Sequence, residues 1–184
     1  ACRLPVPLMN VLNGGAHANN GLDVQEFMIV PTVKNSFSES LRAGAEIFHT
    51  LKKILSKKGL STAVGDEGGF APDVHNADDV FALLEAAIEK SGYKGKVVLG
   101  MDCAASEFWD EDEKKYNLSF KGNTKELISG NDLGELYAKW AAQYNIASIE
   151  DPYDQQDFDS YAKFQNDHGH KFQIVGDDLL VTNP

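Results

Sequence analysis

Three stretches of the chain share one pattern, a run of apolar residues that ends in a carboxylate. They cover residues 97–102 (VVLGMD), 146–151 (IASIED) and 172–178 (FQIVGDD). Apolar runs of this length, separated by helical segments, are typical of buried parallel strands. The carboxyl ends of such strands meet at one rim of a barrel, where the active sites of that architecture lie. The pattern therefore predicts three acidic side chains at one rim.

Carboxylates at one rim repel each other unless a cation lies between them. Their hard oxygen atoms favour Mg²⁺ or a similar ion. The alternative is that each acid only caps a helix or lies in a solvated loop. The pattern alone leaves both interpretations open.

Two further strands are expected earlier in the chain. Residues 5–12 are mainly apolar and end at the turn sequence NGG of residues 13–15, and residues 27–30 end at Pro31. Residues 116–120 alternate in the manner of a surface hairpin strand.

Apolar positions that recur every three or four residues predict four helices. Ser36 and Glu39 form a capping box before the first, and Asn76 caps the second. Glycines 59, 92 and 169 follow the first, second and fourth helices. The residues expected to face the core are Phe37, Leu41, Ala45, Phe48, Leu51 and Leu55, then Val80, Leu83, Leu84, Ala87 and Ile88, then Leu133, Leu136, Tyr137, Trp140 and Tyr144, and last Phe158, Tyr161 and Ala162.

The resulting order is β-β-α-α-β, a hairpin, then α-β-α-β. Alternation of helices and strands predicts an α/β fold with a parallel sheet and right-handed crossovers. The opening ββαα is unlike the start of a standard barrel. We see no repeat, linker or domain boundary, and 184 residues fit about one domain.

Composition and charge argue against several classes of protein. The net charge of −11 argues against a nucleic-acid-binding surface. No apolar stretch of ~18 residues predicts a membrane span, and no secretory signal is visible. Cys2 and Cys103 lack metal-binding spacing, so we expect a reducing compartment and a buried thiol at Cys103. The abrupt ends suggest an internal piece of a longer polypeptide, the alternative being a processed, naturally short chain.

A glycine-flanked acidic loop is the strongest local motif. Residues 65–72 (GDEGGFAP) hold Asp66 and Glu67 between glycines. A carboxyl beside another carboxylate has a raised proton affinity, which suits a general acid, although such loops can also be plain turns. A phosphate-binding loop fails because the acids would repel phosphate and no P-loop lysine follows.

Other candidate residues are weaker on their own. His17 follows a double glycine and could donate to an anion or transfer a proton, or be structural or merely solvated. Glu26 opens an apolar strand, which is unremarkable alone. A serine or cysteine hydrolase is poorly supported, because there is no G-x-S-x-G sequence and Cys103 lacks an identifiable partner.

Six co-linear segments resemble the enolase family, the glycolytic phosphopyruvate hydratases, over essentially the whole chain. They are residues 12–18 (LNGGAHA), 25–29 (QEFMI), 64–72 (VGDEGGFAP), 100–108 (GMDCAASEF), 148–152 (SIEDP) and 175–184 (VGDDLLVTNP). The resemblance implies that residues 1–184 form part of the C-terminal barrel domain. The implied fold is a partial TIM-like (β/α)8 barrel of the enolase type with a ββαα start.

The resemblance also implies roles for individual residues. Asp102, Glu150 and Asp177 match the carboxylates that hold Mg²⁺, and the last two also match substrate-binding positions. Glu67 matches the general acid that helps hydroxide leave, and Glu26 matches a carboxylate that works beside it and contacts substrate.

His17 matches a histidine that contacts substrate near its phosphate end. The implied activity is a Mg²⁺-dependent lyase that converts 2-phosphoglycerate into phosphoenolpyruvate, and the reverse, in a cytoplasmic homodimer. The matching catalytic lysine and the remaining substrate-binding residues would lie beyond Pro184, and an N-terminal domain would precede Ala1. The isolated chain is therefore expected to be inactive, and an unpaired sheet edge predicts poor solubility.

Two other functions stay open. One is a non-catalytic binding or structural protein built on an enolase-like barrel. The other is an enzyme of the wider superfamily that acts on a different carboxylate acid, against which the acidic loop and His17 argue.

Overall fold

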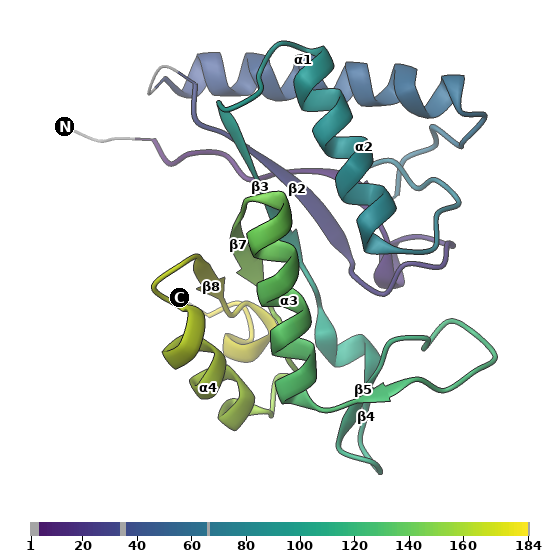
Figure 1. The fold of residues 1–184 in the computed structure, drawn as a ribbon, viewed down its shortest axis with the longest axis vertical. Helices are drawn as coiled ribbons and strands as arrows, with labels where there is room; N and C mark the ends of the chain where they lie inside the picture. Colours follow the sequence, from purple (N-terminus) through teal and green to yellow (C-terminus); the bar gives the residue numbers. More distant parts are fainter. Residues whose placement is uncertain (1–3, 34–35, 66, 184) are drawn as a thin grey trace.

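A five-stranded sheet organises the chain. The computed structural model describes residues 4–33, 36–65 and 67–183 (Figure 1). Cys2, Asp66 and Pro184, named above, lie outside these ranges. The strands of the sheet are β1 (Met9–Asn13), β2 (Glu26–Pro31), β3 (Val97–Asp102), β7 (Ile146–Glu150) and β8 (Gln173–Val175).

Four helices and a small second sheet complete the described ranges. The helices are α1 (Phe37–Lys57), α2 (Ala77–Lys90), α3 (Gly130–Tyr144) and α4 (Phe158–His168). The small sheet contains β4 (Trp109–Asp110), β5 (Lys115–Asn117) and β6 (Leu127–Ile128). The short 3-10 helices are η1 (Gly15–His17), η2 (Ala105–Phe108) and η3 (Asp178–Leu180). None of the described helices is long and apolar enough to cross a membrane.

The sheet order is β1-β2-β3-β7-β8, so the ββαα start is confirmed. The three acid-tipped strands β3, β7 and β8 are neighbours and run parallel, as predicted. The predicted parallel sheet is found for these three strands, whereas β2 runs antiparallel to both β1 and β3. Within the described ranges the sheet stays open and does not close into a barrel.

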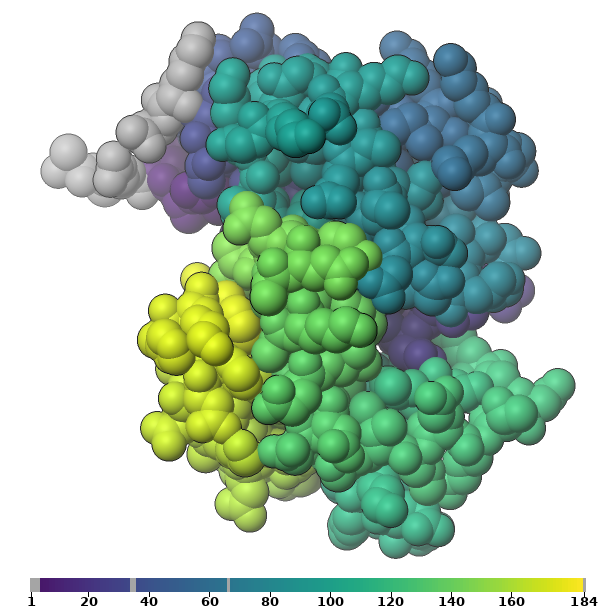
Figure 2. Space-filling view, in the orientation of Figure 1, coloured from purple at the N-terminus to yellow at the C-terminus, as the bar shows by residue number. Residues whose placement is uncertain are grey.

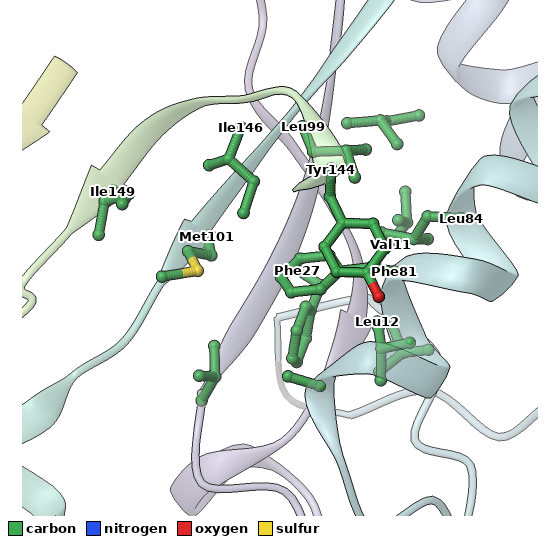
Figure 3. Close-up of a cluster of buried hydrophobic side chains, with 14 of the residues drawn as sticks. Val11, Leu12, Phe27, Phe81, Leu84, Leu99, Met101, Tyr144, Ile146 and Ile149 are labelled. Atoms are coloured by element: carbon green, nitrogen blue, oxygen red, sulfur yellow. The ribbon is translucent and has the colours of Figure 1, made fainter. Parts of the chain in front are cut away.

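Aromatic side chains join the helices to the sheet (Figure 3). The Phe81 ring of α2 packs edge-on against Phe27 of β2, with ring centroids 5.3 Å apart, and stacks on Tyr144 of α3 at 4.7 Å. The first two side chains are fully buried. This cluster packs two helices against the centre of the sheet.

The predicted buried face of α1 is wrong in its first half. Phe37 and Leu41 are 40% and 47% exposed, whereas Ala43, Gly44 and Ile47 are buried. A β-carbon on Gly44 would lie 2.3 Å from Met9 Sδ, so the helix approaches β1 too closely for a large residue there. The small residues therefore face the sheet and turn the bulky ones outward.

Most other helix signals are confirmed. Asn76 caps α2 by accepting from the Asp79 N–H at 2.8 Å, and all five residues expected to face the core from α2 are buried. Ser36 is the N-cap of α1, but its side chain makes no capping hydrogen bond. In α4 Tyr161 is buried as expected, but Phe158 is 59% exposed.

The hairpin of β5 and β6 contacts the rest of the protein through some of its side chains. Tyr116 of β5 is fully buried, and its hydroxyl donates to Asp157 Oδ2 at 2.8 Å and accepts from the Asp154 N–H at 3.0 Å. Lys121 in the hairpin loop donates to the Ala18 carbonyl at 2.8 Å. Figure 2 shows the hairpin projecting at the lower right, with a recess between it and the upper half of the molecule.

Candidate active site

Three carboxylates lie side by side at one end of three adjacent strands, β2, β3 and β7. Glu26, at the start of β2, is the register partner of Asp102 at the end of β3, and Asp102 is in turn the partner of Glu150 at the end of β7. Register partners on adjacent strands present their side chains on the same face. The antiparallel direction of β2 brings its first residue to the edge where β3 and β7 end. Asp177 follows β8 at the same edge.

A close group of three carboxylates differs from the predicted metal set by one residue. Glu150, Asp151 and Asp177 each bring an oxygen atom within 4.8 Å of the other two. Asp102, the register partner of Glu150, is not a member of that group, and its Oδ1 atom accepts from the Ala104 N–H at 2.9 Å. The structure therefore places Asp102 at the strand ends where it was predicted, and it adds Asp151 to the group that contains Glu150 and Asp177.

Asp151 is a member of this acidic group that the sequence did not single out. It is 2% exposed and has a left-handed backbone with φ of 41°. Its Oδ1 atom accepts from the Tyr161 hydroxyl and the Asp177 N–H, each at 3.0 Å, and its Oδ2 atom accepts from the Asp178 N–H at 2.9 Å. These bonds tie the end of β7 to the segment after β8, and they hold Asp177 beside Glu150.

A second group contains the three predicted catalytic and substrate-binding side chains. His17, Glu26 and Glu67 each bring a ligand atom within 4.8 Å of the others, and His17 Nδ1 lies 3.9 Å from Glu26 Oε1. His17 belongs to η1 after β1, and Glu67 belongs to the loop before α2. Residues far apart in the sequence are therefore gathered around the start of β2.

Burial and mutual repulsion raise the proton affinity of these carboxyl groups. Burial, followed by the charges of Glu67 and Glu150, raises the pKa of Glu26 to about 7. Burial and the charge of Glu150 raise the pKa of Asp102 to about 8, against the lowering effect of the Ala104 N–H. The pKa of Glu150 is also raised, first by burial and then by Asp151 and the acids after β8.

The same groups fit a divalent cation. In the three described ranges, no lysine or arginine forms an ion pair with Asp102, Glu150 or Asp177. Unpaired, partly buried carboxylate oxygens are ligands that Mg²⁺ prefers, and a cation would remove the repulsion that raises their pKa values.

The metal-free protein is expected to lose stability as the pH rises. The folded pKa values of Asp102 and Glu26 lie above their ordinary values of 3.8 and 4.5, so the folded state binds more protons than the unfolded chain between about pH 4 and pH 8. Raising the pH from 5 to 8 should lower the free energy of unfolding by about 2 kcal/mol after solvent screening.

Denaturant unfolding of the intact protein in chelator measures this slope. Saturating Mg²⁺ should flatten it, and Asp102→Asn should reduce it. A metal-free stability that is constant or increases over this range would contradict the assignment of the raised pKa values.

Asp151→Asn should weaken Mg²⁺ binding by about 10- to 100-fold, the usual effect of losing a residue that orients a metal ligand. The amide nitrogen cannot accept from the Asp178 N–H, so the segment that carries Asp177 should shift. Calorimetric titration measures the affinity, and Tyr161→Phe is the control that removes only one of the three donors. Unchanged affinity in Asp151→Asn would show that Asp151 does not hold Asp177 in place.

Sequence comparison relates the chain to known proteins over essentially its whole length. The family model described as "Enolase, C-terminal TIM barrel domain" matches residues 1–184. The chain is 55% identical to "Enolase" of Bdellovibrio bacteriovorus over 100% of its length, and 53% identical to "Enolase 2" of Hevea brasiliensis over 98%. It spans 42% of the length of each of these relatives. The chain therefore belongs to the enolase family, within its C-terminal TIM barrel domain.

Proposed function

We propose that this chain is part of a Mg²⁺-dependent enolase that dehydrates 2-phosphoglycerate to phosphoenolpyruvate and catalyses the reverse reaction. The observation that carries the proposal is the row Glu26, Asp102 and Glu150 across three adjacent strands. It joins the acid group of His17, Glu26 and Glu67 to the carboxylates beside Asp177. A substrate lying over this row would contact both groups at once.

Asp102, Glu150 and Asp177 would hold the metal, with Asp151 fixing the last of them. A bound divalent cation would stabilise the second negative charge that develops on the substrate carboxylate when the neighbouring proton leaves. These three carboxylates would fix the distance between the cation and Glu26. His17 would face the phosphate end, where a histidine can donate a hydrogen bond to an anion.

Glu26 and Glu67 would supply the proton for the leaving group. In the dehydration, the bond from C3 to its hydroxyl oxygen breaks, and that oxygen must gain a proton to leave as water. A carboxyl with a pKa of about 7, as Glu26 has, keeps a proton for a substantial part of the time at neutral pH. Glu67 brings a carboxylate oxygen within 4.8 Å of one from Glu26 and is the proposed donor.

The base that removes the C2 proton is proposed to come from outside this sequence. In the described ranges no lysine pairs with a carboxylate of either group. The chain spans 42% of the length of each of the two relatives, and the resemblance to enolases implies a lysine base in a later strand. The chain by itself is therefore expected to lack turnover.

The family also supports a cytoplasmic, homodimeric enzyme of glycolysis, and we include this in the proposal. Cys103 is free and buried, which suits a reducing compartment. Burial raises the pKa of its thiol far above the ordinary value, so it would be unreactive.

A coupled assay of the intact protein tests the proposed function. We expect phosphoenolpyruvate to form from 2-phosphoglycerate with Mg²⁺ and not with chelator. The absence of turnover in the intact, folded, Mg²⁺-loaded protein would overturn the proposal. Binding of 2-phosphoglycerate without turnover would instead favour a non-catalytic binding protein.

A further inference from the structure

The side chain of Asn13 is a buried polar group that the proposed chemistry does not use. It is the last residue of β1 and is 0% exposed. Its Nδ2 atom donates to the Gly69 carbonyl at 3.2 Å, and its Oδ1 atom accepts from the Asn10 side chain. A buried amide without these partners would destabilise the fold, so its presence calls for a structural or functional reason.

Two glycines of the acidic loop leave room for this side chain. A β-carbon on Gly65 would lie 2.3 Å from Asn13 Nδ2, and one on Gly69 would lie 2.8 Å from Asn13 Oδ1. These distances are too short for real contacts. The Asn13 amide therefore fills the space between the two glycines, and the loop that carries Glu67 is formed around it.

Backbone bonds close the loop on itself and on β1. The Gly65 N–H donates to the Gly69 carbonyl at 2.8 Å, and the Asn13 N–H donates to the Phe70 carbonyl at 2.8 Å. Between these bonds lies Glu67, whose own carbonyl accepts from Asn10 Nδ2 at 3.5 Å. Asn10 therefore contacts Glu67 directly, and Asn13 holds the end of the same loop at Gly69 and Phe70.

Asn20 links the end of β1 to the end of the acidic loop. Its Nδ2 atom donates to the Asn13 carbonyl at 3.0 Å and to the Pro72 carbonyl at 2.9 Å. Asn13 thus contacts the acidic loop through its side chain and, through its carbonyl, the segment that carries His17. Asn13 therefore lies between the loop that carries Glu67 and the segment that follows His17.

We propose that Asn13 is a positioning residue that sets the distance of Glu67 from His17 and Glu26. It acts through Gly69 and the closed loop and does not touch the substrate. The expected effect of Asn13 on catalysis rests on the proposed function. Displacing Glu67 should impair departure of the C3 hydroxyl, whereas removal of the C2 proton, which uses other groups, should persist.

The test compares two partial reactions and the exchange of the loop amides in the intact protein. Asn13→Asp keeps the size of the side chain but puts an acceptor against the Gly69 carbonyl. Asn13→Ser removes the amide without adding charge and serves where the first variant does not fold. Ser129→Ala is the matched control, because it removes a helix cap at α3, whose side chain accepts from the Asp132 N–H, and leaves the loop untouched.

We expect Asn13→Asp to lower dehydration of 2-phosphoglycerate by about 100-fold, the low end for a lost general acid. Exchange of the C2 proton with deuterated solvent should fall far less, so the ratio of exchange to dehydration should rise. Hydrogen–deuterium exchange of the peptide around residues 64–71 should become faster, and the control should change neither quantity.

Equal loss of exchange and dehydration would overturn the proposal, and so would unchanged amide exchange in the loop. If the unsubstituted protein shows neither reaction, the proposed function fails instead. In that case the amide exchange alone decides whether Asn13 shapes the loop.

Discussion

Glu150→Gln should abolish tight Mg²⁺ binding and lower turnover of the intact protein by about 1,000-fold. Glu150 is the register partner of Asp102 and also belongs to the group with Asp151 and Asp177, so it lies at the centre of the acidic edge. Glutamine keeps the size of the side chain but removes the negative charge. A metal contributes several kcal/mol to stabilising charge in a transition state, and a loss of about 4 kcal/mol corresponds to this factor.

Calorimetric titration with Mg²⁺ and steady-state kinetics at several Mg²⁺ concentrations measure the two effects. Glu85→Gln, an exposed glutamate on α2, is the matched control and should bind as the unsubstituted protein does. Normal affinity in Glu150→Gln would remove Glu150 from the metal site. Normal affinity with lost turnover would assign it a role toward the substrate alone.

Glu67→Gln should lower dehydration by about 10²- to 10⁴-fold and leave Mg²⁺ binding intact. The amide has the same shape but cannot give a proton to the leaving hydroxyl, and general acids contribute rate factors of this size. Because Glu67 belongs to the group with His17 and Glu26 and not to the metal group, the two functions should separate.

The separation is measured by following C2 proton exchange and phosphoenolpyruvate formation in the same sample. Exchange should survive in Glu67→Gln while product formation falls. Retention of the full rate of product formation would show that another group donates the proton. Loss of Mg²⁺ affinity would show that the two acidic groups act as one site.

The sequence predicted the candidate site well where the signal was local. Asp102 and Glu150 each end an apolar strand, and the parallel pairing of those strands was enough to place them side by side. The same holds for α2, whose cap at Asn76 and apolar spacing depend only on neighbouring residues. Grouping His17, Glu26 and Glu67 required the family resemblance, because no local pattern links them.

The misses have non-local causes. The face of α1 depends on how closely Gly44 approaches Met9, a contact between separate elements. The role of Asp151 depends on a left-handed backbone and on donors from α4 and from the segment after β8. The antiparallel direction of β2 depends on two consecutive helices returning the chain to the sheet. Apolar periodicity predicts the two consecutive helices, but it contains no information on the contact at Gly44 or on the donors to Asp151.

The most direct test of the account is the position of a bound cation. Crystals of the intact protein soaked in Mn²⁺, which has similar ligand preferences, would locate it by anomalous scattering. We predict a peak at the carboxyl ends of β3, β7 and β8, within about 2.2 Å of oxygen atoms from Asp102, Glu150 and Asp177. A fully occupied ion elsewhere, with these three side chains uncoordinated, would contradict it.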